Sequence, residues 1–203
     1  MANRDTRDRL VRTAFDLFFD RGYNATGVGE IVGAIGVPKG SFYTYFASKD
    51  ALACEVIDTY WAQGAKRFSR QAQAADSPIS CLRAHFHELR DKIVASDFRR
   101  GCLVGNLSAE MADQSDTMRA RLAAAFGGWQ AAIADLIEQA RARGEIASVS
   151  EPAELAAILL NSFEGAILRA RADRSQTPFD QFDRVFEALL GLAAEPARPG
   201  SHH

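Results

Sequence analysis

The sequence predicts an all-α protein with about nine helices. Apolar residues recur at intervals of three and four along most of the 203 residues, which is the spacing of one face of an α-helix. Four prolines stand just before or at the start of such stretches, where a fixed φ and a missing N–H are tolerated: Pro38, Pro78, Pro152 and Pro178. No alternating apolar pattern and no Asn-Gly turn predicts a β-hairpin.

Three helices are expected in the N-terminal quarter. The first carries an apolar stripe over residues 10–18 and ends at Gly22, because glycine readily takes the conformation that terminates a helix. Thr26 is expected to cap a short second helix. Gly36 then allows a sharp turn into a third short helix over residues 38–46.

The remaining helices follow with the same apolar spacing. Ser48 is expected to cap a long helix that reaches residue 74. Further helices are expected around these residues: 79–93, 106–110, 118–140, 152–171 and 179–193. Gly144 lies just past the end of one of them, where a helix-stopping glycine belongs.

Residues 26–46 have the pattern of a helix-turn-helix unit, two short helices joined by a tight glycine turn. Phe42 and Phe46 are expected to pack inward. The side chains left to face outward are Lys39, Ser41, Tyr43, Thr44 and Tyr45. Exposed tyrosines on so short a helix need a cover, and hydroxyl, lysine and aromatic groups suit the phosphates, sugars and bases of DNA. The alternative is a small three-helix core with incidental exposed aromatics.

The same segment resembles the DNA-binding domain of TetR-family transcriptional regulators. The matching residues are Gly22-Tyr23, Gly36-Val37 and the run KGSFYTYFASKDAL over 39–52, and the resemblance covers about residues 8–54. It implies an N-terminal three-helix domain and a homodimer whose recognition helices enter successive major grooves of a palindromic operator in double-stranded DNA. By position it assigns DNA contact to Thr26, Lys39, Gly40, Ser41, Tyr43, Thr44, Tyr45 and Lys49.

The overall charge excludes a protein coated in positive charge, but it does not exclude a repressor. The net charge is −2, and residues 1–50 hold seven Lys and Arg against six Asp and Glu. Binding to DNA would therefore depend on few phosphate contacts per subunit and on hydroxyl and aromatic contacts. No apolar run is long enough for a membrane span and no leader opens the chain, so we expect a cytoplasmic protein without membrane contact.

We expect residues 1–50 to form the DNA-binding domain, residues 51–195 a helical ligand-binding and dimerisation domain, and residues 196–203 a disordered tail. The resemblance implies that the last two long helices pair with their copies in a four-helix bundle. Both helices are apolar on more than one face, which agrees with burial on two sides. The expected interface residues are Leu160, Phe163, Ile167, Phe182, Phe186 and Leu189. The alternative is that they form the core of a monomer.

A second unusual stretch runs from Arg99 to Met111, where two glycines flank Cys102. It resembles a subgroup of the family that responds to acrylate-type acids and N-substituted maleimides. Arg99 and Arg100 are expected to stabilise the Cys102 thiolate and raise its reactivity toward electrophiles. The alternative is that Cys102 is a small buried apolar residue.

The candidate effector-binding residues include Cys102 and the pair one helical turn apart, Asn106 and Glu110. Four aromatic residues are further candidates for the walls of a cavity, with an ordinary core position as the alternative for each: Tyr60, Trp61, Phe86 and Trp129. The three cysteines form no Cys-x-x-Cys pair and two histidines two residues apart diverge on a helix, so no metal site and no cofactor are expected.

These observations predict a ligand-responsive repressor that a small-molecule effector releases from its operator, in a first interpretation by reacting with Cys102. A second reading keeps the regulator but makes it a non-covalent sensor of a small hydrophobic or carboxylate compound, with Cys102 inert. A helical enzyme is the reading from another class. The sequence holds no nucleophile–base pair, metal spacing or nucleotide loop that would support it, so we expect no enzymatic activity.

Overall fold

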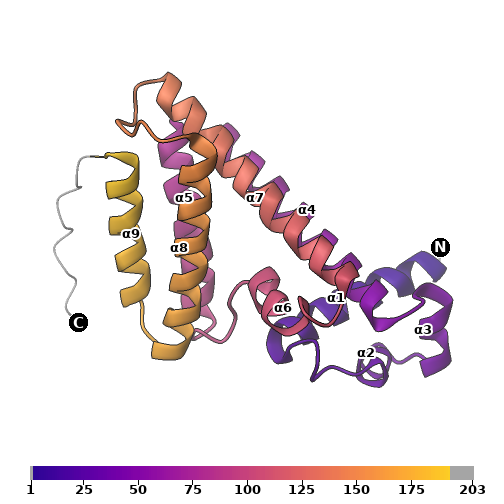
Figure 1. The fold of residues 1–203 in the computed structure, drawn as a ribbon. Helices are drawn as coiled ribbons and strands as arrows, with labels where there is room; N and C mark the ends of the chain where they lie inside the picture. The colour runs from indigo at the N-terminus through magenta and orange to yellow at the C-terminus, as the bar shows by residue number, and fades with distance from the viewer. Residues whose placement is uncertain (1, 193–203) are drawn as a thin grey trace.

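The computed structural model describes residues 2–192 and is all-helical over that range (Figure 1). The predicted fold class is confirmed. The helices are α1 (Ala2–Arg21), α2 (Val28–Ala34), α3 (Lys39–Tyr45), α4 (Lys49–Ala74), α5 (Pro78–Ala95), α6 (Leu103–Met111), α7 (Asp116–Ala142), α8 (Pro152–Asp173) and α9 (Thr177–Leu190). The tail expected at 196–203 lies outside the described residues.

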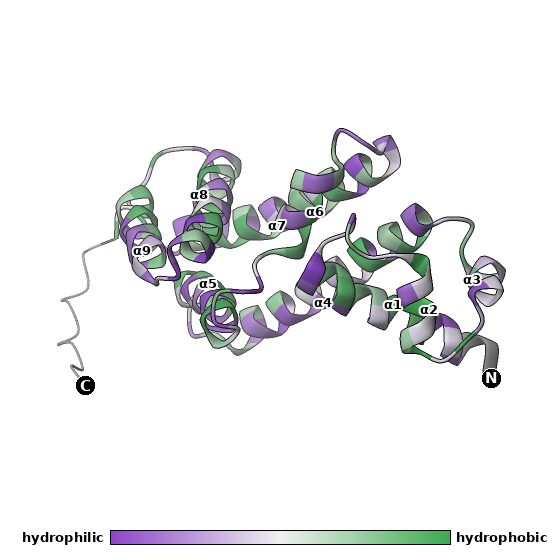
Figure 2. Cartoon of the chain, turned by 90° about the horizontal axis from the view of Figure 1, so that it is seen from below, coloured by the Kyte–Doolittle hydropathy of each residue, from purple (hydrophilic) through white to green (hydrophobic). Residues whose placement is uncertain are grey.

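The molecule is elongated, with two groups of helices at its ends and two long helices between them. Helices α1, α2 and α3 gather at one end, and α5, α8 and α9 at the other (Figure 1). The long helices α4 and α7 pack against each other and connect the two ends. Each long helix carries both hydrophobic and hydrophilic residues, as the colours of Figure 2 show, so each has a face for the core and a face for solvent.

The helix ends follow local chemistry. Ser48 caps α4 as expected, because its Oγ accepts a hydrogen bond from the backbone N–H of Ala51 at 3.1 Å. Gly22, Gly36 and Gly144 all have positive φ, in agreement with their predicted roles at helix ends. The predicted cap of α2 by Thr26 is wrong: Gly27 is the N-cap residue, and the Thr26 hydroxyl turns back to donate to the carbonyl of Gly22 at 2.8 Å.

An aromatic cluster fills the space between α5, α8 and α9. The ring centroids of Phe86, Phe163 and Phe182 lie 4.9 Å from one another, and each ring is at most 3 % exposed. Phe86 therefore belongs to the core, which was the alternative for it, and it lines none of the three cavities described below. Rings packed edge to face at this distance stabilise beyond the apolar area they bury.

A buried polar chain crosses the same half of the molecule. The Trp129 indole N–H donates to Nε2 of His85 at 3.1 Å, and Nδ1 of His85 pairs with the side-chain oxygen of Gln71 at 3.1 Å. Burial, together with the positive charges of Arg67 and Lys92, lowers the pKa of His85 from its ordinary value of 6.5 to about 3. His85 is consequently neutral in the folded protein at any ordinary pH.

Within residues 2–192, no helix combines the length and the apolar character that crossing a bilayer requires.

The buried neutral His85 makes stability depend on pH. Its folded pKa of about 3 lies below the ordinary value of 6.5, so its contribution is fully present above pH 6.5 and is lost as the pH falls toward 3. Between pH 7 and pH 5 this one group should cost about 2 kcal/mol of unfolding free energy. Urea unfolding of wild type and His85→Gln at both pH values, at one protein concentration, measures the difference. His87→Gln leaves His85 in place and should retain this loss; equal losses in wild type and His85→Gln would contradict the assignment.

Candidate nucleic-acid interface and effector cavity

Helices α2 and α3 form a helix-turn-helix unit around a small apolar core. Phe42 is fully buried and its ring lies 5.8 Å from that of Phe46, which is also buried. Ile31 and Val32 of α2 are buried with them. The Gly36 backbone, with φ of 71°, makes the turn between the two helices. The packing therefore decides which side of α3 faces outward.

The outward side of α3 carries most of the residues expected to contact DNA. Tyr43 is 59 % exposed, Lys39 and Thr44 are exposed, and Ser41 and Tyr45 are half-buried. A Cβ added to Gly40 would meet no atom within 4 Å apart from its chain neighbours and its own helix backbone, so packing does not require glycine there. A large aromatic side chain left in solvent on a short helix is typical of a surface that another molecule covers.

Two residues expected at this surface point inward. Thr26 is 0 % exposed. The Lys49 ammonium donates to the backbone carbonyls of Tyr23 at 3.0 Å and Thr26 at 2.9 Å, and it lies 3.9 Å from the centre of the Tyr23 ring. Both side chains hold the turn between α1 and α2. The Thr26 side chain is therefore out of reach of DNA, whereas Lys49 is half-buried with its ammonium bound to two carbonyls, so its contact with DNA stays a prediction.

A cavity of about 760 Å³ lies between the end of α1, α6, α7 and α8. Its polar lining includes Cys102, Asn106 and Glu110, so the structure brings together the three residues that the sequence placed in one stretch. It also includes Glu164 and Arg171 of α8, which the sequence analysis missed. A glutamate within the apolar run of α8 was the signal for the first of them, because a charge there must face a cavity or a partner.

Cys102 also lines a second cavity, of about 510 Å³, together with Tyr60, Trp129 and Arg100. Tyr60, Trp61 and Trp129 enclose a third, much smaller space of about 40 Å³. The aromatic residues expected around a cavity are therefore found there, except Phe86.

The surroundings of Cys102 favour the neutral thiol. Burial raises its pKa well above the ordinary value, the neighbouring Glu164 raises it further, and the backbone N–H groups of Val104 and Gly105 oppose this shift. The thiol donates to the Glu164 carboxylate, and the Tyr60 hydroxyl donates to the sulfur. The sulfur at the start of α6 thus has three hydrogen-bond donors around it, and one carboxylate accepts a hydrogen bond from its thiol.

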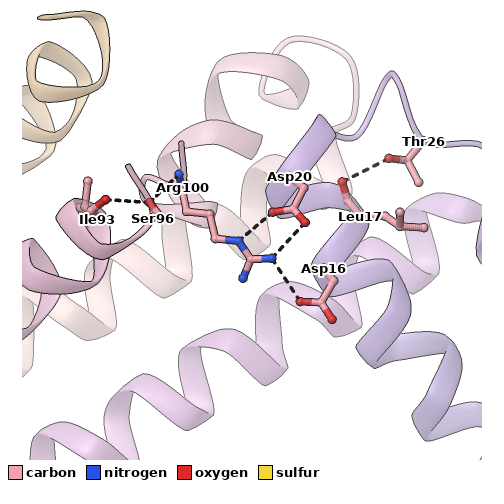
Figure 3. A network of polar contacts seen from close by, with 7 residues as sticks. All are labelled: Asp16, Leu17, Asp20, Thr26, Ile93, Ser96 and Arg100. Carbon is pink, nitrogen blue, oxygen red and sulfur yellow. Dashed lines mark hydrogen bonds and ion pairs between the residues drawn. The ribbon is translucent and has the colours of Figure 1, made fainter. Parts of the chain in front are cut away.

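Neither Arg99 nor Arg100 stabilises a Cys102 thiolate as expected. Arg99 lies 3.7 Å from Asp97, and Arg100 donates to Asp20 at 2.7 Å with its guanidinium 5.3 Å from the centre of the Phe19 ring. Figure 3 shows Arg100 reaching from the segment before α6 to Asp16 and Asp20 of α1. The two cations are engaged elsewhere, so the predicted stabilisation of a Cys102 thiolate by Arg99 and Arg100 is wrong.

The glycines that flank Cys102 make room for α8. A Cβ on Gly105 would lie 2.5 Å from a carboxylate oxygen of Glu164, and a Cβ on Gly101 would lie 2.9 Å from the Arg171 side chain. Arg171 donates to the side-chain oxygen of Asn106 at 2.7 Å. Burial raises the pKa of Glu164, and its Oε1 has no hydrogen-bond partner among the described residues. One cation and one unsatisfied carboxylate oxygen therefore face the larger cavity.

Five of the six residues expected at a dimer interface are covered within one chain. Leu160, Phe163, Ile167, Phe182 and Phe186 are at most 5 % exposed, and Leu189 is half-buried. A second copy cannot cover side chains that the chain itself already buries, so this prediction mistook the core of the subunit for its surface.

Two family models match the chain. One, described as the C-terminal domain of tetracyclin repressor-like proteins, matches residues 78–186. The other, described as bacterial regulatory proteins of the tetR family, matches residues 10–56.

Relatives match over nearly the whole length. The transcriptional repressor DhaR of Mycobacterium sp. strain GP1 is 34 % identical over 94 % of this chain and 95 % of its own. The transcriptional regulator AcuR of Cereibacter sphaeroides is 37 % identical over 87 % and 81 %. The crystal structure of the reduced form of NemR from E. coli superposes with a TM-score of 0.81 at 28 % identity, over 95 % of this chain and 100 % of that one.

The adjacent glycines of α7 offer a test of the cavity wall. A Cβ on Gly128 would lie 2.5 Å from the Trp61 ring, whereas a Cβ on Gly127 would meet nothing within 4 Å. Gly128→Ala should therefore destabilise by about 1–3 kcal/mol, because an aromatic ring must move. Gly127→Ala should stabilise by up to about 1 kcal/mol through helix propensity. Urea unfolding compares the two; equal effects would contradict the packing of Trp61 on Gly128.

Proposed function

Because the chain belongs to the TetR family of bacterial transcriptional regulators, we propose that it is a repressor that binds a palindromic operator as a homodimer and is released by a small molecule bound beside Cys102. The family and the relatives are regulators, so the chain is a DNA-binding regulator and not an enzyme. The observation that carries the operator assignment is the outer face of α3, with Tyr43 exposed between Lys39 and Thr44.

The contacts of α3 with the operator follow from the chemistry of that face. Lys39 and the hydroxyls of Ser41, Thr44 and Tyr45 suit phosphate oxygens, and the Tyr43 ring suits sugars and thymine methyl groups. Packing within the chain does not require glycine at position 40. The absence of a side chain there allows the DNA backbone to approach closely. Thr26 and Lys49 support this face indirectly, by holding the turn that leads into α2.

The surface proposed for the second copy is the outer side of α8 and α9. Ile158 and Val185 are each 39 % exposed there, and Leu168 is 67 % exposed. An added Cβ on Gly165 would meet nothing within 4 Å, which lets a partner helix approach closely, and Gly165 and Leu168 also border the 760 Å³ cavity. Apolar side chains in solvent on two neighbouring helices are stabilised when a second copy covers them. Two subunits joined here would present two recognition helices to one operator.

The proposed effector is a small carboxylic acid held by Arg171. The guanidinium lines the larger cavity and forms no ion pair with any acidic side chain of residues 2–192. A planar guanidinium binds a carboxylate through two parallel hydrogen bonds. This agrees with the resemblance of residues 99–111 to the subgroup that responds to acrylate-type acids.

The state of Cys102 decides between the two readings of that subgroup. A buried thiol with a raised pKa is a poor nucleophile, which favours an effector bound beside the sulfur rather than attached to it. An electrophile that does reach the sulfur would find Glu164 in position to take the thiol proton. Non-covalent binding is therefore the first reading, and alkylation of Cys102 is the second.

Replacing Tyr43 tests the operator surface. Tyr43→Ala removes the most exposed aromatic contact of α3 and should raise the operator Kd at least about tenfold, because a contact made by both subunits is lost twice. Tyr43 is exposed, so its removal should leave the unfolding curve unchanged. Fluorescence anisotropy with operator DNA found by selection from a random pool measures the Kd. Undiminished binding by Tyr43→Ala would reject this surface.

Two compounds separate the readings of the effector site. Sodium acrylate should raise the operator Kd of wild type and Cys102→Ser alike, and Arg171→Gln should need about tenfold more of it, since the cation that anchors the carboxylate is gone. N-ethylmaleimide should act on wild type and not on Cys102→Ser if alkylation is the switch, with mass spectrometry reporting the adduct. A wild-type protein that responds to neither compound would exclude this effector class.

A further inference from the structure

The turn that joins α1 to α2 is held by hydrogen bonds to side chains of two helices, α4 and α6. From α4, Lys49 holds the carbonyls of Tyr23 and Thr26, and Asp50 accepts the hydroxyl of Tyr23. Tyr23 itself is 4 % exposed and packs its ring 5.3 Å from that of Phe18. Because this turn leads directly into the helix-turn-helix unit, whatever holds it also sets the orientation of α2 and α3.

The second set of hydrogen bonds comes from Glu110 of α6, which lines the larger cavity. The Glu110 carboxylate of α6 accepts the backbone N–H of Asn24 at 2.9 Å and that of Tyr23 at 3.3 Å. The chain passes so close to this carboxylate that a Cβ on Gly22 would lie 2.5 Å from its Oε1. Gly22 is thus required twice, once for its φ of 88° and once for the space that Glu110 occupies. Hydrogen bonds from backbone N–H groups to a carboxylate are among the stronger ones in proteins.

The same carboxylate forms part of the wall of the 760 Å³ cavity, and so do Arg21 and Gly22 of the DNA-binding end. A molecule in that cavity would therefore lie against the group that holds the turn. The cavity and the turn before α2 are in direct contact, because Glu110 belongs to both.

We propose that Glu110 is a positioning residue for operator binding: its carboxylate holds the turn before α2 in the orientation that fits the operator, and an occupant of the cavity acts by drawing Glu110 away. This proposal rests on the proposed function for the identity of the occupant, but the hydrogen bonds of Glu110 belong to the free protein. An occupant lowers operator affinity to the extent that it binds the released arrangement better than the held one.

The first experiment uses the protein without any effector and compares Glu110→Ala, Glu110→Gln and the control Asp113→Asn. Asp113 is exposed in the segment that follows α6, so its replacement removes a nearby charge without touching the turn between α1 and α2. Amide hydrogen exchange at Tyr23 and Asn24 should accelerate in Glu110→Ala and less in Glu110→Gln, which keeps one acceptor oxygen. The operator Kd should rise about tenfold and about threefold respectively, and less than twofold in Asp113→Asn, as two, one and no hydrogen bonds are lost.

Exchange that stays slow at both amides, or an operator Kd of Glu110→Ala within twofold of wild type, overturns the proposal. The midpoint of thermal unfolding serves to separate positioning from folding. The graded order of the two Glu110 variants at an unchanged midpoint supports positioning, and a loss of operator affinity that merely follows a lowered midpoint overturns it.

The second experiment fills the cavity from within the chain. Ala109 lines the cavity beside Glu110, so Ala109→Phe stands in for an occupant. It should raise the operator Kd about fivefold in wild type and less than twofold in the Glu110→Ala background, because coupled groups are not additive. Equal effects in the two backgrounds, or no effect in wild type, overturn the coupling. This comparison is a double-mutant cycle of Ala109 and Glu110. If it shows the expected coupling while the operator Kd of wild type responds to neither acrylate nor N-ethylmaleimide, the effector class is wrong and the role of Glu110 stands.

Discussion

The packing of α4 on α7 is the constraint on which the rest of the structure depends. These two helices connect the group α1, α2 and α3 with the group α5, α8 and α9 (Figure 1), and residues of both line the cavities. Trp61 of α4 lies in a notch that exists only because residue 128 of α7 has no side chain. Protein interiors are close-packed, so such a contact transmits displacement instead of absorbing it.

Two glycines also determine the chemistry of the cavity. Gly105 and Gly101 let Glu164 and Arg171 approach the segment around Cys102, and the resulting burial keeps the thiol neutral and raises the pKa of the glutamate. The structure thereby corrects the idea of a thiolate stabilised by arginines. A small acid bound by Arg171 beside a neutral thiol agrees better with these electrostatics than a sulfur already activated for attack.

Most of the fold could be predicted because its signals are local. The spacing of apolar residues, the prolines at helix starts and the glycines at positions 22, 36 and 144 each act within a few residues. The outer face of α3 followed from Phe42 and Phe46, which must turn inward. Thr26 and Lys49 could not be placed in this way, because their partners are backbone carbonyls that only the turn between α1 and α2 brings near.

The sequence by itself determined that the chain is all helical, that its N-terminal part carries a helix-turn-helix unit, and that Cys102, Asn106 and Glu110 lie on one short segment. Only the tertiary structure decided that Phe163 and Phe182 fill the subunit core while Leu168 faces outward. Only it showed that Glu110 reaches the backbone of Asn24. The physical reason is that helical periodicity records which residues are apolar, whereas the choice of partner depends on helices that meet from distant parts of the chain.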